Sequence, residues 1–263
     1  MKVGILTSGG NAPCLSASIG FLMNNYYLHD PNIEIFGYLY GYKGLLTDKK
    51  IRLDEKVSKV FLNHGGTPLG NSRVKLSNVD DCINNKYINE GENPIAIAAE
   101  KLKADNINVL HVIGGDDTNT TAAELVDFLK KNNYDLTVVG MPKTIDNDIY
   151  PIVQTLGAVT AAETGAKFFN NIVNESTTSS RHLIIHEVMG RNCGWLAAAT
   201  ANYYRNNLLN KKKFIDNTLI NIKSFDIHAL YIPEIDVDFN KEIISLNKIM
   251  DHYDSVNIFL SEG

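Results

Sequence analysis

The sequence predicts an α/β fold in three layers, with a mostly parallel β-sheet covered by helices on both faces. Short apolar runs alternate along the chain with stretches whose apolar residues recur at helical spacing. Two of these runs, in the segment 109–148, end abruptly in polar turns that contain glycine, proline or aspartate. The alternation continues without an internal repeat or a long linker. A parallel sheet is the structure that such alternation predicts.

Each element is expected from its own pattern. The strands are expected at the short apolar runs 2–7, 33–40, 109–113, 136–142, 182–188 and 256–260. The helices are expected where apolar residues recur every three or four positions, at 13–23, 93–105, 118–131, 156–173, 195–201 and 243–253. Two of these helices are predicted to carry proline in the first turn, at Pro13 and Pro94. A turn is expected at 41–44, an ordered loop at 64–73 and less regular structure at 203–238.

Composition and charge exclude several classes of protein. The net charge of −5 gives no electrostatic footprint for nucleic acid or for an anionic membrane. The three cysteines, Cys14, Cys82 and Cys193, lie far apart, which fits a reducing compartment better than a disulfide framework. The N-terminus reaches glycines too soon for a signal peptide. No run approaches the ~18 apolar residues of a membrane span. We therefore expect a cytoplasmic protein.

The segment 109–148 carries the strongest chemical signal. Its two apolar runs are followed by the turns 114–118 (GGDDT) and 142–148 (PKTIDND). Adjacent parallel strands release their loops at the same carboxyl edge of a sheet, so the two turns are expected to share one crevice. Paired glycines let a backbone approach a phosphate closely, and carboxylates hold Mg²⁺ or accept a proton. The sequence therefore predicts a phosphoryl-transfer site.

Two other segments could contribute to that crevice. The turn 8–13 (SGGNAP) joins an expected strand to an expected helix, where free backbone N–H groups form an anion site. A plain tight turn is the alternative, and neither the dinucleotide fingerprint nor the phosphate-loop motif is present. Arg73 ends the glycine-rich loop 64–73. It is either a solvated side chain or a bidentate phosphate ligand, and the sequence leaves both open.

Five motifs together resemble one family. TSGGNAP, GGTPLGNSR, IGGDDT, PKTIDND and EVMGRNCG occur in the order and spacing typical of the phosphofructokinases, over nearly the whole chain. The chain resembles the pyrophosphate-dependent branch, because Asp117 and Lys143 stand where ATP-dependent members have glycine. Longer stretches, GGDDTNTTAA and HEVMGRNCGWL among them, resemble bacterial members of that branch most. A carboxylate at Asp117 would repel the α-phosphate of a nucleotide, and Lys143 would supply a cation for a two-phosphate donor.

The resemblance implies a role for each matching residue. Asp146 is the expected general base for the sugar 1-hydroxyl, with Thr144 and Asp148 as supporting residues of the same loop. Arg73 and Lys143 are expected to offset charge on the phosphoryl group in flight. The expected donor-binding residues are Gly10, Tyr42, Asp117 and Lys143. Asp116 is the expected Mg²⁺-associated carboxylate. The expected sugar-phosphate residues are Thr144, Asp146, Asp148, Met189, Gly190, Arg191 and Glu262.

The resemblance also implies a phosphofructokinase-like domain organisation. Residues 1–150 are expected to form a donor-phosphate-binding α/β domain, and residues 151–263 the start of a sugar-phosphate-binding domain whose C-terminal part is absent. Two positions depart from the pattern: Asn11 replaces an aspartate, and His182 replaces an arginine for which Arg181 is one residue out of place.

The implied reaction is Mg²⁺-dependent transfer of phosphate from pyrophosphate to the 1-hydroxyl of fructose 6-phosphate. Its products are fructose 1,6-bisphosphate and phosphate, and the step is a reversible one in glycolysis. A homo-oligomer, dimer or tetramer, is implied as well. An ATP-dependent enzyme and a truncated, non-catalytic subunit that keeps the donor site are the alternatives. We expect the 263-residue chain to bind Mg-pyrophosphate but to bind fructose 6-phosphate poorly.

Overall fold

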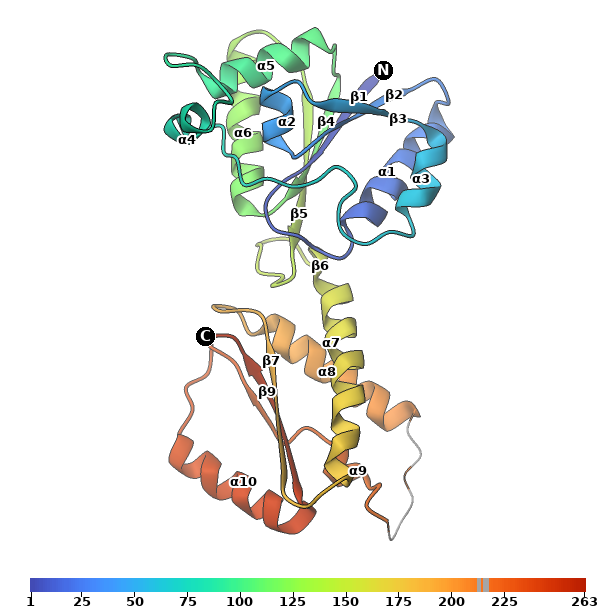
Figure 1. Ribbon diagram of the computed structural model, residues 1–263, viewed down its shortest axis with the longest axis vertical. Helices are drawn as coiled ribbons and strands as arrows, with labels where there is room; N and C mark the ends of the chain where they lie inside the picture. Colours follow the sequence, from blue (N-terminus) through green and yellow to red (C-terminus); the bar gives the residue numbers. More distant parts are fainter. Residues whose placement is uncertain (212–213, 215–217) are drawn as a thin grey trace. The chain divides into compact units, whose positions relative to one another are not determined.

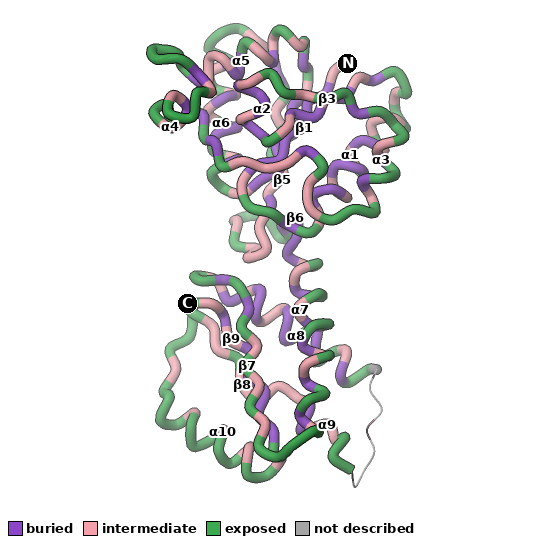
Figure 2. The backbone as a smooth tube through the Cα atoms, viewed as in Figure 1, coloured by how far each residue is buried: buried purple, intermediate pink, exposed green. Residues whose placement is uncertain are grey.

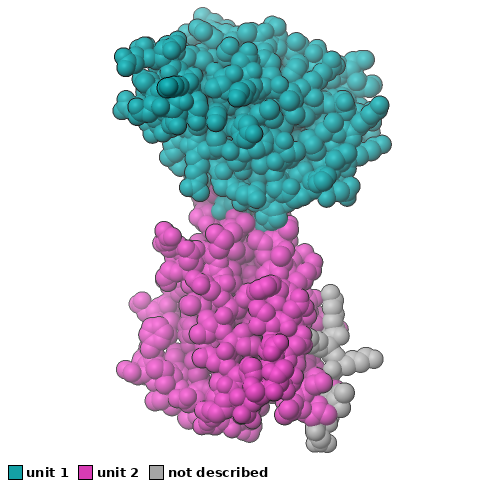
Figure 3. Space-filling view, in the orientation of Figure 1, with its two compact units in different colours: residues 1–144, 155–157 teal, residues 145–154, 158–263 magenta. Residues whose placement is uncertain are grey.

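The computed structural model describes residues 1–211, 214 and 218–263, and its chain divides into two compact units (Figure 3). Unit 1 comprises Met1–Thr144 and Thr155–Gly157, and unit 2 comprises Ile145–Gln154 and Ala158–Gly263. The boundary expected at residue 150 falls inside the segment 145–154, which belongs to unit 2.

Unit 1 is a six-stranded sheet with helices on both faces (Figure 1). Its elements are β1 (Lys2–Thr7), α1 (Leu15–His29), β2 (Glu34–Tyr38), α2 (Tyr42–Leu46), β3 (Lys50–Leu53), α3 (Glu55–Phe61), α4 (Val79–Asn84), α5 (Pro94–Ala104), β4 (Val109–Gly114), α6 (Asp116–Lys131), β5 (Thr137–Thr144) and β6 (Leu156–Gly157). The strand order is β3-β2-β1-β4-β5-β6, and only the β2–β3 pair is antiparallel. The chain leaves β1 for β2 on one side and later returns to β4 on the other. Ligands bind at such a switch point, beyond the carboxyl ends of the strands.

Much of the sheet of unit 1 is buried (Figure 2), and an apolar cluster lies on each of its faces. Val3 and Ile5 of β1 belong to a cluster that α1 and α3 cover, whereas Leu6 points to the opposite face. There it joins a second cluster with residues of α5 and α6, among them Leu102 and Leu125. This confirms the predicted fold class, because the central strand β1 buries apolar side chains on both sides, as a doubly covered sheet requires.

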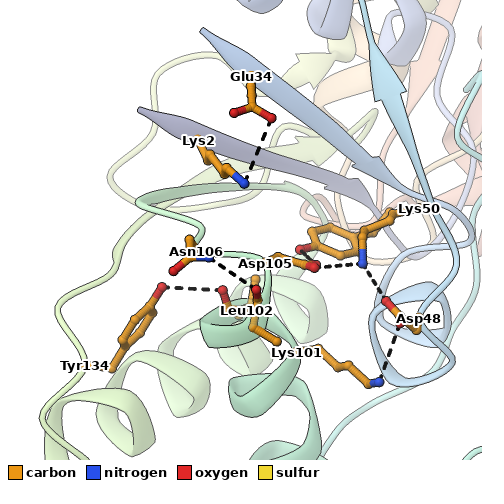
Figure 4. Close-up of polar contacts among 11 residues, drawn as sticks. Lys2, Glu34, Asp48, Lys50, Lys101, Leu102, Asp105, Asn106 and Tyr134 are labelled. Carbon is orange, nitrogen blue, oxygen red and sulfur yellow. Dashed lines mark hydrogen bonds and ion pairs between the residues drawn. The ribbon is translucent and has the colours of Figure 1, made fainter.

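The antiparallel edge strand β3 was not expected from the sequence, and charged side chains hold it in place (Figure 4). The Nζ of Lys50 lies 2.6 Å from Asp48 Oδ1 and 2.7 Å from Oδ1 of Asp105, which follows α5. The hydroxyl of the buried Tyr38 donates to the other Asp105 oxygen at 2.9 Å. Two of the four residues of β3, Lys50 and Arg52, are charged, and so short a strand gives too little apolar periodicity for a prediction.

Unit 2 has a three-stranded parallel sheet with the order β7-β9-β8. Its elements are α7 (Ala158–Ile172), the 3₁₀ helix η1 (Val173–Thr177), β7 (His182–Val188), α8 (Trp195–Lys211), α9 (Ile222–Phe225), β8 (Ala229–Tyr231), α10 (Phe239–Tyr253) and β9 (Ser255–Ser261). Phe169 of α7, Tyr204 of α8 and Phe259 of β9 form the centre of its core, with ring centroids 4.6–4.7 Å apart for the Phe169 pairs.

Several predicted boundaries were wrong, and local geometry explains them. Pro13 precedes the N-cap residue Cys14, so it lies outside the helix instead of in its first turn. The expected turn at 41–44 contains the start of α2, because Gly41 has φ of +64° and caps that helix. The less regular stretch expected from residue 203 begins later, since α8 continues to Lys211.

Two of these corrections affect the chemistry. The helix expected from Thr118 begins at Asp116, so both aspartates of GGDDT lie in the first turn of α6. The strand β5 continues through Thr144, which places Lys143 in the sheet and not in a turn. In addition, Leu156 and Gly157 pair with β5 as β6, before the helix α7 begins. In the part of the chain that the structure describes, no helix has both the length and the apolar character to cross a bilayer.

Candidate active site

A pocket of about 580 Å³ lies at the carboxyl edge of the sheet in unit 1. Its lining comes from the loop after β1, the segment 73–75, the start of α6 and the end of β5: Ser8, Gly9, Gly10, Arg73, Val74, Lys75, Gly115, Asp116, Asp117, Thr118 and Lys143. All of these residues belong to unit 1. The two turns of the segment 109–148 are thus represented here by 115–118 and Lys143, as expected from adjacent parallel strands.

The loop after β1 is shaped by its glycines. Gly9 has φ of +84°, a conformation that other residues rarely adopt. The backbone N–H of Ser8 donates to the carbonyl of Ile113 on β4 at 3.0 Å, so the loop starts against the neighbouring strand. A Cβ on Gly10 would lie 3.7 Å from the Nζ of Lys143. The glycine loop and the lysine therefore lie side by side in the pocket.

Hydrogen bonds to the same loop place Arg73, which the sequence could not do. The carbonyl of Ser72 accepts from the backbone N–H of Gly9 and from the Ser8 hydroxyl, both at 2.9 Å. The side-chain amide of Asn71 donates to the carbonyl of Gly10 at 3.2 Å. Two consecutive residues before Arg73 are thus tied to the glycine loop. As a result, the arginine lines the pocket.

The start of α6 forms another wall. A Cβ on Gly114 would lie 2.5 Å from Thr118, so only glycine permits this tight passage from β4 into the helix. The side-chain amide of Asn119 donates to the carbonyls of Gly114 and Gly115 at 2.8 and 3.0 Å, which fixes the turn. Asp117 forms an ion pair with Lys75 across 2.8 Å.

Two further residues predicted to bind the donor, Lys143 and Tyr42, differ in whether they line the pocket. Lys143 is almost buried, with 7% of its surface exposed, and it lines the pocket. Tyr42 does not line it. The ring is fully buried, and the hydroxyl donates to the carbonyl of Thr118 at 2.9 Å. Burial, followed by the nearby Glu124, raises the pKa of this hydroxyl. The structure therefore places Tyr42 in the core, where its hydroxyl supports the first turn of α6.

The predicted sugar-phosphate residues lie mostly in unit 2. The thiol of Cys193 donates to the carbonyl of Asp146 at 3.4 Å, which connects the segment 145–154 with the turn after β7. In that turn Gly190 has φ of +128°, and its carbonyl accepts from the buried Ser261 hydroxyl at 2.6 Å. The structure thus brings the Asp146 backbone, the Met189–Arg191 turn and the end of β9 together within unit 2.

The charged residues of this group are more exposed. Arg191 pairs with Glu262 at 3.4 Å, and 75% of the arginine side chain is exposed. Met189 and Asp148 are exposed as well. Thr144 is separate from them, because it ends β5 in unit 1, where its carbonyl accepts from the Thr155 hydroxyl at 2.7 Å.

Arg181, the arginine one residue out of place, pairs with Asp251 at 2.7 Å.

Three residues near these groups were missed as site candidates. Lys75 lines the pocket two positions after Arg73, and that spacing was the only available signal. A carboxylate oxygen of Glu234 accepts from the backbone N–H of Gly194 at 2.7 Å, at the start of α8. Cys193 contacts Asp146, as described above. The contacts of Glu234 and Cys193 join segments far apart in the sequence, so sequence spacing alone could not reveal them.

Among the described residues, no group of three or more His, Cys, Asp or Glu side chains is arranged to hold a metal ion. Mg²⁺ does not need such a cage, because it usually keeps several waters and binds one or two carboxylates plus phosphate oxygens of the substrate. The exposed Asp116 carboxylate lines the pocket and fits this mode of binding.

An α/β protein with glycine loops and cations at a switch point belongs to the broad class of phosphate-binding α/β proteins. Comparison with known proteins is more specific, since a family model described as Phosphofructokinase matches residues 2–262. The chain belongs to the phosphofructokinase family, which confirms the resemblance seen in its motifs.

Curated relatives agree with this assignment. A pyrophosphate–fructose 6-phosphate 1-phosphotransferase from Methylomonas methanica is 51% identical over 265 residues, covering the whole chain and 64% of the relative. A protein of the same name from Propionibacterium freudenreichii is 48% identical, covering 100% of this chain and 65% of the relative. An ATP-dependent 6-phosphofructokinase 2 from Clostridium perfringens is 36% identical over 200 residues, covering 74% of the chain and 51% of the relative. The chain thus spans 64% and 65% of the length of the first two of these relatives.

Solved structures show the same fold. A pyrophosphate-dependent phosphofructokinase from Marinobacter aquaeolei has a TM-score of 0.75 at 21% identity, covering 99% of this chain and 60% of that one. A phosphofructokinase from Saccharomyces cerevisiae has a TM-score of 0.71 at 25% identity, covering 100% of this chain and 34% of that one.

Proposed function

We propose that the protein acts in Mg²⁺-dependent phosphoryl transfer from pyrophosphate to the 1-hydroxyl of fructose 6-phosphate, giving fructose 1,6-bisphosphate and phosphate. The observation that carries this proposal is the pocket of unit 1, which combines a glycine loop, three cations and two aspartates at the start of a helix. Relatives about 50% identical bear the name of this reaction. The proposal includes reversibility, because pyrophosphate as the donor lacks the larger energy drop of ATP use.

Unit 1 is the donor domain in this proposal. The backbone of Gly10 and the side chains of Arg73 and Lys143 bind pyrophosphate and offset the charge that develops on the transferring phosphate. Asp116 holds Mg²⁺, which neutralises phosphate oxygens when it is bound. Asp117 occupies the space that a longer phosphate chain or a nucleotide would need. Tyr42 acts from the core, by supporting the turn that carries both aspartates.

Unit 2 begins the acceptor domain. Asp146 is the proposed general base that takes the proton from the sugar 1-hydroxyl, and Thr144 and Asp148 support it in the same sequence motif. Met189, Gly190, Arg191 and Glu262 are the proposed sugar-phosphate residues. Their arrangement on one turn, with the end of β9 bonded to it, supports this assignment. Action in the cytoplasm, as a homo-oligomer, completes the proposal.

Calorimetric titration of the 263-residue chain tests the donor assignment directly. With Mg²⁺ present, pyrophosphate should bind and ATP should bind far more weakly. Turnover should be assayed with both donors, on this chain and on any longer natural form. Tighter binding of ATP would show an ATP-dependent enzyme. Pyrophosphate binding without turnover in every form would show a non-catalytic subunit that keeps the donor site.

A further inference from the structure

The ion pair between Lys75 and Asp117 joins two walls of the donor pocket. Lys75 comes from the segment that also carries Arg73, and Asp117 comes from the first turn of α6. Their charged atoms lie 2.8 Å apart, and the side chains are 46% and 74% exposed. Of the three cations that line the pocket, Lys75 is the one to which the donor chemistry above assigns no individual role, so this contact requires its own explanation.

Packing and hydrogen bonds hold the backbone in place at both Lys75 and Asp117. The neighbours of Lys75 are buried, with 8% of Val74 and 1% of Leu76 exposed, so the lysine is held with its side chain turned outward. The carbonyl of Lys75 accepts from the backbone N–H of Asn78 at 3.2 Å. On the other wall, the carbonyl of Asp117 accepts from the hydroxyl of the buried Thr121 at 2.9 Å. The pair therefore links two positions that the fold already determines.

Stability does not account for the pair. Exposed ion pairs contribute little to the free energy of folding, with a median of about 0–1 kcal/mol. The location is more informative, because the N-terminus of a helix attracts anions, including phosphates. Here the protein places its own carboxylate in the first turn of α6, and a cation from the opposite wall holds it there.

We propose that Lys75 is a specificity-determining residue for the donor, an inference that rests on the proposed function. By holding Asp117 between the two walls, it keeps the carboxylate where a third phosphate would lie. It also neutralises that carboxylate, so that pyrophosphate beside Lys143 and Arg73 is not repelled. Selectivity for a two-phosphate donor is then a property of the pair and not of Asp117 alone.

The loss of Lys75 distinguishes this role from simple charge attraction. If Lys75 only attracted phosphate, its removal would weaken binding of the more highly charged tripolyphosphate more than that of pyrophosphate, and selectivity for pyrophosphate would rise. If it holds Asp117 in place, its removal lets the carboxylate move aside, and selectivity for pyrophosphate falls. The two explanations predict changes of opposite sign.

The experiment measures the dissociation constants of inorganic pyrophosphate and inorganic tripolyphosphate, each with Mg²⁺, by calorimetry on the 263-residue chain. For Lys75→Met we expect the selectivity ratio to fall about tenfold, since specificity is a difference between two affinities. Lys75→Arg keeps the pair and should keep the ratio. The charge-swapped variant Lys75→Asp/Asp117→Lys keeps the net charge but places a lysine where a third phosphate would lie, so its ratio should fall as well.

Lys101→Met is the matched control, because Lys101 pairs with Asp48 outside the pocket. The selectivity ratio of this variant should equal that of the unmodified chain. The melting temperature of each variant shows whether it is folded. In a folded Lys75→Met variant, a selectivity ratio that rises or stays constant would overturn the proposal. Loss of selectivity in a folded Lys75→Arg variant would overturn it too. Failure of the unmodified chain to bind pyrophosphate is a different result, and it would contradict the proposed function itself.

Discussion

The two units bury their sheets differently. In unit 1 both faces are covered, and separate apolar clusters lie on either side. In unit 2 one cluster packs α7 and α8 against the sheet, whereas α10 has no buried residue. Leu183 and Ile185 of β7 remain 56% and 55% exposed. Among the described residues, unit 1 therefore has the more complete core.

The difference extends to the functional residues. In unit 1 the pocket walls are fixed by backbone hydrogen bonds between β1, β4 and the loop before Arg73. In unit 2 the predicted acceptor residues lie on exposed turns, and Arg191 already pairs with Glu262. A sugar phosphate carries about two charges and needs several cations. The comparison indicates that the proposed donor half is preformed in unit 1, whereas the proposed acceptor half is weakly built from the described residues.

The largest expected effect separates the chemical step from donor binding. Asp146→Asn removes the proposed base, so kcat should fall by about 10²–10⁴-fold, the usual contribution of general acid–base catalysis. Pyrophosphate affinity should not change, since the pocket lies in unit 1. Turnover assays on an active form, with calorimetry on this chain, check both statements. Glu163→Gln, exposed on α7 of unit 2, is the control and should leave kcat unchanged. Near-normal kcat in Asp146→Asn would remove this residue from the base role.

The second prediction concerns donor choice within unit 1. Asp117→Gly combined with Lys143→Gly should weaken pyrophosphate binding at least about tenfold and admit ATP, because one change opens space for a third phosphate and the other removes a cation. Fructose 6-phosphate binding should be unaffected if the two halves are independent. Calorimetry with the three ligands measures this. A variant that keeps full preference for pyrophosphate would break the link between these residues and the donor.

The sequence could predict most of unit 1 because its signals are local. The runs at β1 and β4 are largely buried and each leads into a glycine-containing turn, so strand, turn and helix follow from neighbouring residues. The GGDDT turn was located correctly, although the helix starts two residues earlier than expected. Asp116 and Asp117 can occupy helical positions because acidic residues suit the first turn.

What the sequence could not predict depends on contacts between distant residues. The position of Arg73 follows from the bonds between Ser72 and the loop after β1, more than sixty residues away. The burial of Tyr42 follows from its place in the core cluster, where its hydroxyl donates to the Thr118 carbonyl of α6. The strand β3 is fixed by Lys50 and Asp105, whose charges carry no strand signal. Such contacts are set by tertiary packing, and neither spacing nor composition records them.

The third prediction tests the core of unit 1 through pH. His111 on β4 is 6% exposed, and its Nε2 lies 2.7 Å from the Tyr26 hydroxyl of α1. Burial lowers the pKa of His111 to about 4, from 6.5. The fold therefore favours the neutral ring. Its contribution to stability is complete above pH 6.5 and is lost as the pH falls from 6.5 towards 4.

Between pH 7 and pH 5 this linkage amounts to about 2 kcal/mol of unfolding free energy. His111→Gln, which keeps a partner for Tyr26 but does not titrate, should lose less stability over that range. Trp195, the one tryptophan of the chain, lies in unit 2, so hydrogen exchange of β1 and β4 is the suitable probe. Equal acid sensitivity of both proteins would show that His111 is not the titrating group.

The smallest expected effect concerns the hydrogen bond from the Cys193 thiol to the Asp146 carbonyl. A thiol is a weak donor, and even an ordinary hydrogen bond contributes only about 0.5–1.5 kcal/mol, so Cys193→Ala should lower kcat by about two- to fivefold. Cys193→Ser keeps a donor and should lose less. Neither change should alter pyrophosphate affinity, because both act on the acceptor half. Kinetics with both variants, together with calorimetry, measure these effects. If alanine and serine reduce kcat equally, the contact does not position Asp146. If pyrophosphate affinity falls as well, the donor half is not preformed as the comparison requires.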